Sequence, residues 1–270
     1  FGNHEVKEPV DSNKGEEASL PQMPLGFKNI SNTDHNYQLV DTEEKRNSLI
    51  HLLKDHSFFC FDTETTGLDA NNCELVGLSF SVKQGEAWYV PLPADQNECR
   101  TIVAAFKSVL ENPLISKIGQ NIKYDILVLK WYDINMQGEL FDTMLAHYLI
   151  DPDSRHNMDL LAENYLNYSP VSISTLIGDK GKNQGNMRDA DIEKVKEYAG
   201  EDADITLQLK TVFEPILKSV NAWKLAEEME NPLIYVLADI EHEGVKIDQE
   251  ALLEFSKTLE TDIKELKKTI

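Results

Sequence analysis

The sequence has only three cysteines, no apolar run long enough to cross a membrane, and few basic residues for its length. Cys60, Cys73 and Cys99 form no C-x-x-C pair, which argues against a disulfide-stabilised secreted fold and for a reducing cytoplasm. No stretch of 18 apolar residues occurs, so no membrane span is predicted. Lysine and arginine total 26 against 47 acids, a net charge of −21. That balance excludes a generally basic nucleic-acid surface and leaves room for a local basic groove.

The chain also lacks internal repeats and the G-x-x-x-x-G-K-[ST] loop of nucleotide-driven motors. What it has is an ordinary globular composition, 41% hydrophobic and 27% charged, over 270 residues. That length suits one full domain with extensions, and a core that needs no disulfides. Residues 1–36 are polar and punctuated by prolines, which predicts a flexible linker.

Hydrophobic patterning predicts strands first and helices afterwards. Short apolar runs bounded by turn residues indicate strands at 57–62, 74–82, 86–92 and 114–118. Helical periodicity starts near Asp41 and then covers 97–112, 121–132, 143–150, 157–166 and 190–218. This order predicts an α/β fold with a mixed sheet flanked by helices. Long, charged, amphipathic helices follow from about residue 220.

The sharpest motif is Asp62-Thr63-Glu64, at the end of the first predicted strand. Because alternate residues of a strand share a face, Asp62 and Glu64 project together. Two carboxylates held on a buried strand are costly unless something positive lies between them, and oxygen-rich pairs suit Mg²⁺ or Mn²⁺. The alternative is that Asp62 caps a turn and Glu64 faces solvent.

A second motif, Gly119-Gln120-Asn121-Ile122-Lys123-Tyr124-Asp125, follows the fourth predicted strand and opens a helix. Asn121 and Asp125 are four residues apart and share a helix face. A carboxylate one turn into a helix that follows a core strand can reach a site at the strand ends. The alternative is an Asn121 N-cap with a solvated Asp125.

The third motif is Tyr198-Ala199-Gly200-Glu201-Asp202-Ala203-Asp204. Tyr198 and Asp202 share a helix face, so a phenol beside a carboxylate could orient a water for attack. Glu201 and Asp204 point elsewhere, and we expect both to be solvated. The alternative is a core tyrosine next to an exposed acidic turn.

Taken together and in this order, the three motifs resemble the 3′–5′ proofreading exonuclease module of the DNA polymerase I family, in its tyrosine-bearing branch. The surrounding segments agree, including FDTETTGLD (61–69), KIGQNIKYD (117–125) and YAGEDADITLQL (198–209). The resemblance runs from about 37 to 215. Residues 230–248 also resemble the segment that leads into the polymerase part of the same family.

The resemblance implies a ribonuclease-H-like sheet and a two-metal hydrolysis that releases nucleoside 5′-monophosphates. The metals would be two divalent ions, Mg²⁺ or Mn²⁺, held by Asp62, Glu64, Asp125 and Asp202. Tyr198 would hydrogen-bond the attacking water. The path of the 3′-terminal nucleotides would be lined by Leu68, Gln120, Asn121, Lys123 and Tyr124.

The same resemblance implies a domain organisation and partners. Residues 1–36 would be a linker, 37–218 the exonuclease domain, and 219–270 the helical start of the polymerase thumb region, truncated here. The expected partners are a single-stranded or frayed 3′ end of DNA and the rest of the polymerase chain. We expect a cytoplasmic monomer that does not engage a membrane.

Some residue assignments and two functions stay open at this point. Lys180, Lys182 and Arg188 lie in a glycine- and asparagine-rich loop and either contact phosphate or are simply solvated. One alternative function is an RNA-trimming exonuclease relative with the same carboxylates. Another is a catalytically inactive spacer that positions a polymerase, which the four retained carboxylates and Tyr198 disfavour.

Overall fold

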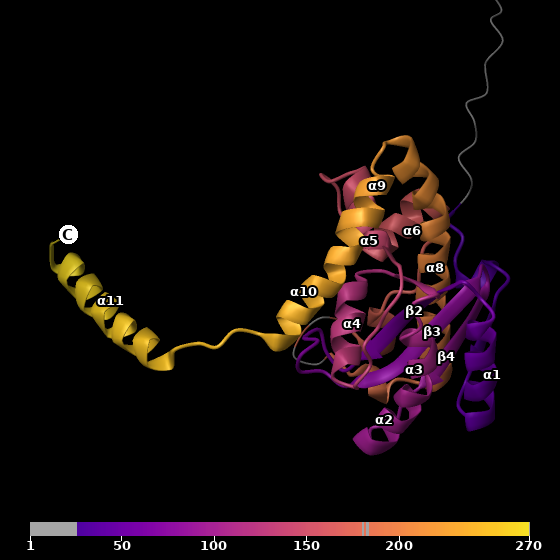
Figure 1. Ribbon diagram of the computed structural model, residues 1–270, viewed down its shortest axis with the longest axis horizontal. Helices are drawn as coiled ribbons and strands as arrows, with labels where there is room; N and C mark the ends of the chain where they lie inside the picture. Colours follow the sequence, from indigo (N-terminus) through magenta and orange to yellow (C-terminus); the bar gives the residue numbers. More distant parts are fainter. Residues whose placement is uncertain (1–25, 180, 182–183, 270) are drawn as a thin grey trace, which may run out of the picture.

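A six-stranded sheet forms the centre of the molecule in the computed structural model, which describes residues 26–179, 181 and 184–269 (Figure 1). The strand order is β1-β4-β3-β2-β5-β6. β2–β3 and β3–β4 pair antiparallel, and the remaining pairs are parallel. The predicted mixed sheet flanked by helices is therefore confirmed. The strands are β1 Asn36–Leu39, β2 Phe58–Thr65, β3 Leu75–Lys83, β4 Glu86–Pro91, β5 Ser116–Gly119 and β6 Leu140–Asp142.

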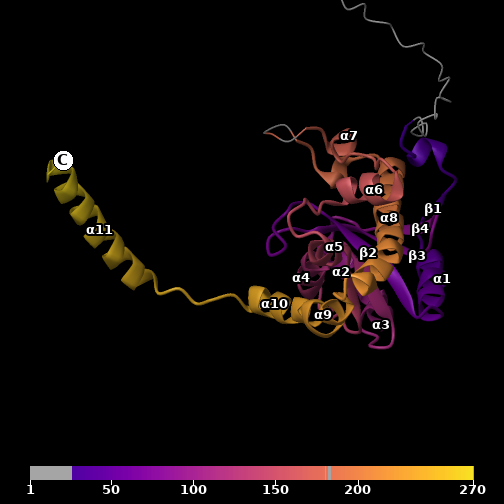
Figure 2. The same ribbon diagram turned by 90° about the horizontal axis from the view of Figure 1, so that it is seen from above.

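Helices cover both faces of this sheet and continue beyond it (Figures 1 and 2). Short 3-10 turns form at Ile30–Asn32 and Met187–Asp189, and a π-helical turn at Ala226–Glu230. The α-helices are α1 Glu43–Lys54, α2 Gln96–Ala105, α3 Lys107–Leu110, α4 Ile122–Lys130, α5 Thr143–Ile150, α6 Met158–Leu166, α7 Ser174–Ile177, α8 Ile192–Ser219, α9 Trp223–Leu225, α10 Asn231–Glu243 and α11 Gln249–Thr269.

The two faces of β2 belong to different cores. Phe59 and Phe61 pack in the larger core with residues of α1–α4, whereas Cys60 packs in a second core with residues of α5, α6 and α8. The 28-residue helix α8 crosses this second face and contacts strands β1 to β5. Because residues alternate along a strand, Asp62 and Glu64 share the face of Cys60 and therefore look toward α8.

Four differences separate the structure from the sequence prediction. β2 continues to Thr65, so Asp62 and Glu64 lie within the strand rather than at its end. The predicted helix 97–112 is divided into α2 and α3 at Phe106, whose buried ring stacks on Phe80 with centroids 5.2 Å apart. The edge strands β1 and β6 were not predicted, because four and three residues are too few to show a period.

The C-terminal helices differ in how they contact this body. α10 packs on α4 and buries Ile234 and Ala238. It ends at Gly244, whose φ of 68° is a conformation that glycine adopts without strain. α11 then stands apart from the sheet in both views, with no residue buried (Figures 1 and 2). No helix in the described residues is long and apolar enough to cross a membrane.

Candidate active site

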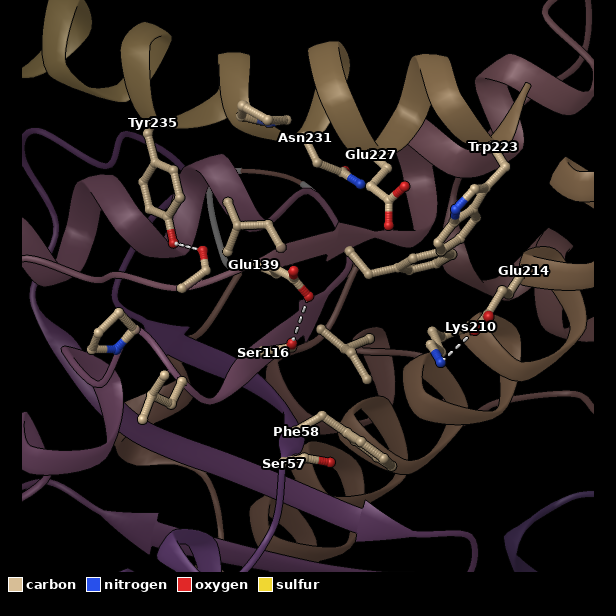
Figure 3. A pocket seen from close by; sticks show the side chains of 17 residues that line it. Ser57, Phe58, Ser116, Glu139, Lys210, Glu214, Trp223, Glu227, Asn231 and Tyr235 are labelled. Carbon is tan, nitrogen blue, oxygen red and sulfur yellow. Dashed lines mark hydrogen bonds and ion pairs between the residues drawn. The ribbon is translucent and has the colours of Figure 1, made fainter. Parts of the chain in front are cut away.

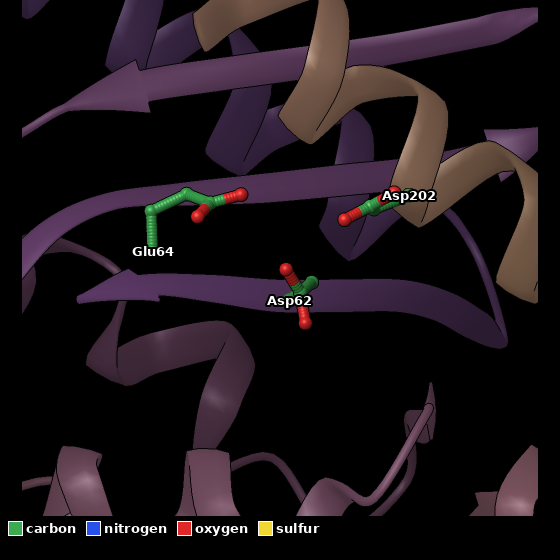
Figure 4. Close-up of side chains that lie close together, drawn as sticks. All are labelled: Asp62, Glu64 and Asp202. Atoms are coloured by element: carbon green, nitrogen blue, oxygen red, sulfur yellow. The ribbon is translucent and has the colours of Figure 1, made fainter. Parts of the chain in front are cut away.

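Three carboxylates converge between β2 and α8 (Figure 4). Asp62 and Glu64 come from the strand, and Asp202 comes from the middle of the helix. Each offers an oxygen, and these atoms lie within 4.8 Å of one another. Glu64 and Asp202 are buried, and Asp62 is partly buried. The two alternatives in which Glu64 faces solvent or Asp202 lies on an exposed acidic turn are therefore wrong.

The electrostatics of this cluster favour a bound cation. Glu64 Oε1 and Asp202 Oδ1 are buried and have no hydrogen-bond partner within the described residues. Burial raises the pKa of Asp62 to about 7. Burial and the charge of Asp62 together raise the pKa values of Glu64 and Asp202 well above their usual range. Unpartnered, converging carboxylate oxygens are the donors that Mg²⁺ and Mn²⁺ prefer, so these residues fit a divalent metal.

Asp125 approaches the same strand from the other side of the sheet. It lies on α4, is 2% exposed, and accepts hydrogen bonds through Oδ1 from the N–H of Thr63 at 3.1 Å and its hydroxyl at 2.6 Å. Burial, followed by the charge of Asp62, raises its pKa well above the usual range. Asp125 is thus buried beside the cluster rather than solvated, but it is not one of the three converging residues.

Tyr198 lies one turn before Asp202 on α8. Burial raises the pKa of its phenol, and the charges of Asp202, Glu64 and Asp62 raise it further. The hydroxyl therefore stays protonated next to the carboxylates and is able both to donate and to accept a hydrogen bond.

The turn between β5 and α4 carries two of the predicted substrate residues, Gln120 and Asn121, and the first turn of α4 carries two more, Lys123 and Tyr124. Gln120 is held in place, because its amide donates to the carbonyl of His156 at 2.8 Å and its oxygen accepts from Thr143. Asn121 adopts a left-handed conformation with φ 59°, and its side chain makes no capping hydrogen bond, so the alternative of a capping Asn121 with a solvated Asp125 is wrong. Its side chain is exposed and available to a ligand.

The loop after β2 is joined to this turn by one tyrosine. Tyr124 donates its hydroxyl to the carbonyl of Gly67 at 2.6 Å, and its oxygen lies 2.6 Å from the hydroxyl of Thr65. The next residue, Leu68, is 93% exposed. The loop therefore presents an apolar side chain to solvent directly after Gly67, the residue that Tyr124 contacts.

A 3′–5′ exonuclease family model matches residues 37–218 of this sequence. The chain belongs to that family. It is 37% identical over 226 residues to DNA polymerase I of Pseudomonas aeruginosa, covering 80% of this chain and 25% of the relative. It is 36% identical over 220 residues to DNA polymerase I of Borreliella burgdorferi, covering 80% and 24%. The exonuclease chain thus spans about a quarter of the length of these curated relatives.

Solved structures share the fold of this exonuclease at low sequence identity. The polymerase domain of Pol1 from M. smegmatis, in complex with DNA primer-template and dNTP, has a TM-score of 0.67 at 21% identity, covering 84% of this chain and 36% of that one. Brucella melitensis NrnC with bound Mg²⁺ has a TM-score of 0.62 at 21% identity, covering 80% and 98%. Both share the fold of this chain, which agrees with the predicted ribonuclease-H-like sheet flanked by helices.

Two acids of the exonuclease that were predicted to be solvated are buried. Glu201 accepts from the hydroxyl of Tyr168 at 2.6 Å and the N–H of Val171 at 2.7 Å. Asp204 accepts from the hydroxyl of Tyr37 at 2.9 Å and the N–H of Gly85 at 2.9 Å. The prediction failed because α8 is covered on several sides, so its acidic residues serve as buried acceptors for neighbouring segments. In the sequence, the one sign of this burial is that Tyr37 and Tyr168 stand in otherwise polar surroundings.

Of the three loop cations that could contact phosphate or be solvated, only Arg188 lies in the described part of the chain, and it does neither. Arg188 lies against Glu74 at 3.3 Å and donates to the carbonyls of Leu75 and Leu92, so its guanidinium is occupied within the molecule. Lys180 and Lys182 lie outside the described residues.

A separate cavity of about 750 Å³ opens at one end of the sheet, away from the carboxylate cluster (Figure 3). It lies at the amino ends of β2, β5 and β6, against α8 to α10. Its polar groups pair with one another, as Lys210 does with Glu214 at 2.6 Å and Ser116 with Glu139 at 3.3 Å. None of the ten predicted site residues lines it, and this cavity lies further along β2 and α8 than the carboxylate cluster.

Proposed function

We propose that this exonuclease removes nucleotides from the 3′ end of DNA as nucleoside 5′-monophosphates, using two divalent metal ions, Mg²⁺ or Mn²⁺. The observation that carries the proposal is the convergence of Asp62, Glu64 and Asp202, with buried carboxylate oxygens that lack partners. Asp125 completes the proposed ligand set from the opposite face of the sheet. When bound, the ions supply positive charge at the scissile phosphate and favour deprotonation of a water.

The residues of the chain then hold the metals and the attacking water in position, and Tyr198 supplies a protonated hydroxyl. Tyr198 stays protonated beside Asp202 and can hold the attacking water through its hydroxyl. No side chain at the cluster has to act as a nucleophile, because water is the attacking group. The rigid attachment of Asp62 and Glu64 to a central strand keeps the carboxylates in place without substrate.

The proposed substrate is a single-stranded or frayed 3′ end. Leu68 presents an exposed apolar side chain for a terminal base, and Gln120, Asn121, Lys123 and Tyr124 line the approach to it. In relatives four times as long, the rest of the polymerase chain would deliver the strand, and the reaction would serve proofreading. We further propose a cytoplasmic monomer in which 1–36 is a linker, 37–218 the exonuclease domain and 219–270 the start of the polymerase region.

Digestion of a 3′-labelled single strand tests the proposal. With Mn²⁺ or Mg²⁺ we expect release of labelled nucleoside 5′-monophosphate, which EDTA stops and Asp202→Ala abolishes. A matched RNA strand distinguishes DNA hydrolysis from RNA trimming, since the two differ only in the 2′-hydroxyl and the base methyl. Absence of metal-dependent release from either strand would indicate the structural spacer instead.

A further inference from the structure

Helix α10 forms an ion pair on each side of its contact with α4. Glu241 pairs with Lys123 in the first turn of α4, and Asp239 pairs with Lys130 in its last turn, with Oδ1 2.6 Å from Nζ. Ile234 of α10 is buried at the contact between the two helices. The two pairs thus use the same helices and the same charge types, and differ in their distance from the carboxylate cluster.

Lys123 is the only cation among the ten proposed site residues. It lies in the first turn of α4, two residues after Asn121 and next to Tyr124. Its ammonium contacts the carboxylate of Glu241, so the positive charge available to an approaching phosphate is cancelled at short range. Both side chains of this pair are partly exposed, so a phosphate can reach Lys123 if the carboxylate moves aside.

Helix α10 also contacts this turn through a second set of hydrogen bonds. The N–H of Asp142 lies 3.4 Å from Asn231 Oδ1 on α10. The carboxylate of Asp142 in turn accepts from the N–H groups of Asn121 at 3.2 Å and Ile122 at 2.8 Å. The position of α10 is therefore linked both to the charge of Lys123 and to the backbone of the turn.

We propose that Glu241 is a positioning residue that competes with the DNA phosphate for Lys123 and so weakens strand binding while α10 rests on α4. The inference rests on the proposed function, since it assumes that the strand passes Lys123. An exposed ion pair is weak, so Glu241 moderates binding without blocking it.

Strand affinity of the full 270-residue chain with Glu241→Gln tests this. A short 5′-fluorescein-labelled oligothymidylate is titrated by anisotropy in EDTA, where no hydrolysis occurs. At low salt we expect Kd to fall about two- to fivefold, the range that corresponds to an exposed ion pair. The slope of log affinity against log salt should steepen by about 0.7, as for one more phosphate contact to a single strand. With Mn²⁺, KM should fall by the same factor at unchanged kcat.

Three variants serve as controls. Glu241→Asp keeps the carboxylate and should bind as the wild type does. Asp239→Asn frees Lys130 on the same pair of helices and should also leave Kd unchanged. In the Lys123→Gln background, which should itself bind more weakly, adding Glu241→Gln should tighten binding less than it does in the wild type, because no ammonium is released.

Three results would overturn the proposal. Glu241→Gln could bind as the wild type does, Asp239→Asn could tighten binding equally, or the Glu241→Gln gain could be undiminished without Lys123. The first result would show that the pair does not limit binding, and the second that only total charge matters. A wild type that binds the strand but releases no nucleotide with Mn²⁺ would refute the proposed function instead, and the Kd comparison would still test Glu241.

Discussion

Thr63 fastens Asp125 to the central strand through two hydrogen bonds that end on one carboxylate oxygen. Thr63 lies between Asp62 and Glu64 in sequence, yet its side chain points to the opposite face of the sheet. The strand that carries two of the converging carboxylates is therefore tied to α4 by the residue between them. Asp125 has a structural role in addition to the metal-binding role proposed for it.

This double role predicts opposite effects for two substitutions of Asp125. Asp125→Ala leaves the Thr63 N–H and hydroxyl without their acceptor, which should lower the free energy of unfolding by about 1–3 kcal/mol. Asp125→Asn keeps an acceptor oxygen and removes a charge that burial disfavours, so in EDTA at pH 8 it should be at least as stable as the wild type. Urea unfolding measures both. Equal stability of the two variants would show that the hydrogen bonds from Thr63 contribute nothing to the free energy of unfolding. Both variants should also lose nuclease activity.

Catalysis should depend more on the carboxylates than on the phenol. Asp62→Ala and Asp202→Ala remove charge that would hold the proposed metals, and should lower the rate of nucleotide release by several orders of magnitude. Tyr198→Phe removes only the hydroxyl proposed to orient the water, so its loss should be about 10²–10⁴-fold at most. Single-turnover rates with Mn²⁺ measure the ranking, and circular dichroism confirms folding. A Tyr198→Phe loss as deep as that of Asp202→Ala would contradict the assigned roles.

The raised pKa values of the cluster predict that the metal-free exonuclease loses stability as pH rises. The pKa of Asp62 is about 7 when folded, against roughly 3.9 in an unfolded chain. Between these two pH values the folded state binds more protons than the unfolded chain does. The contribution of Asp62 to the free energy of unfolding therefore falls as pH rises through about 7. Urea unfolding in EDTA should therefore give a lower free energy at pH 8 than at pH 5.5. Asp62→Asn should reduce that difference, and an unchanged profile would mean that Asp62 is ionised when folded.

The buried acid Asp204 should matter for stability and not for chemistry. Asp204→Ala leaves the Tyr37 hydroxyl and the Gly85 N–H without their acceptor, which should cost about 1–3 kcal/mol of unfolding free energy. Glu193→Ala, an exposed acid on the same helix, should stay within about 0.5 kcal/mol of the wild type. Nuclease activity per folded molecule should be unaffected in both. A loss of activity without loss of stability in Asp204→Ala would place it in the site.

The sequence by itself determined the features that depend on local spacing. The period of two in β2 placed Asp62 and Glu64 on one face of the strand, and the spacing of four in α8 placed Tyr198 and Asp202 on one face of the helix. Short, mostly apolar runs bounded by turn residues predicted the central strands. The structure agrees, since eight consecutive residues of β3 are buried. The resemblance to the exonuclease family could also be seen in the sequence, because its motifs consist of residues that lie close together along the chain.

Only the tertiary structure decided which acids are buried and what they contact. Glu201 and Asp204 look like surface residues in sequence, and they are buried because Tyr168 and Tyr37 pack on α8 from distant segments. The short strands β1 and β6 exist through their pairing with neighbours, since three or four residues carry too little periodicity of their own. The Lys123–Glu241 pair joins residues 118 positions apart. Such contacts arise from the packing of whole elements, which local patterning does not encode.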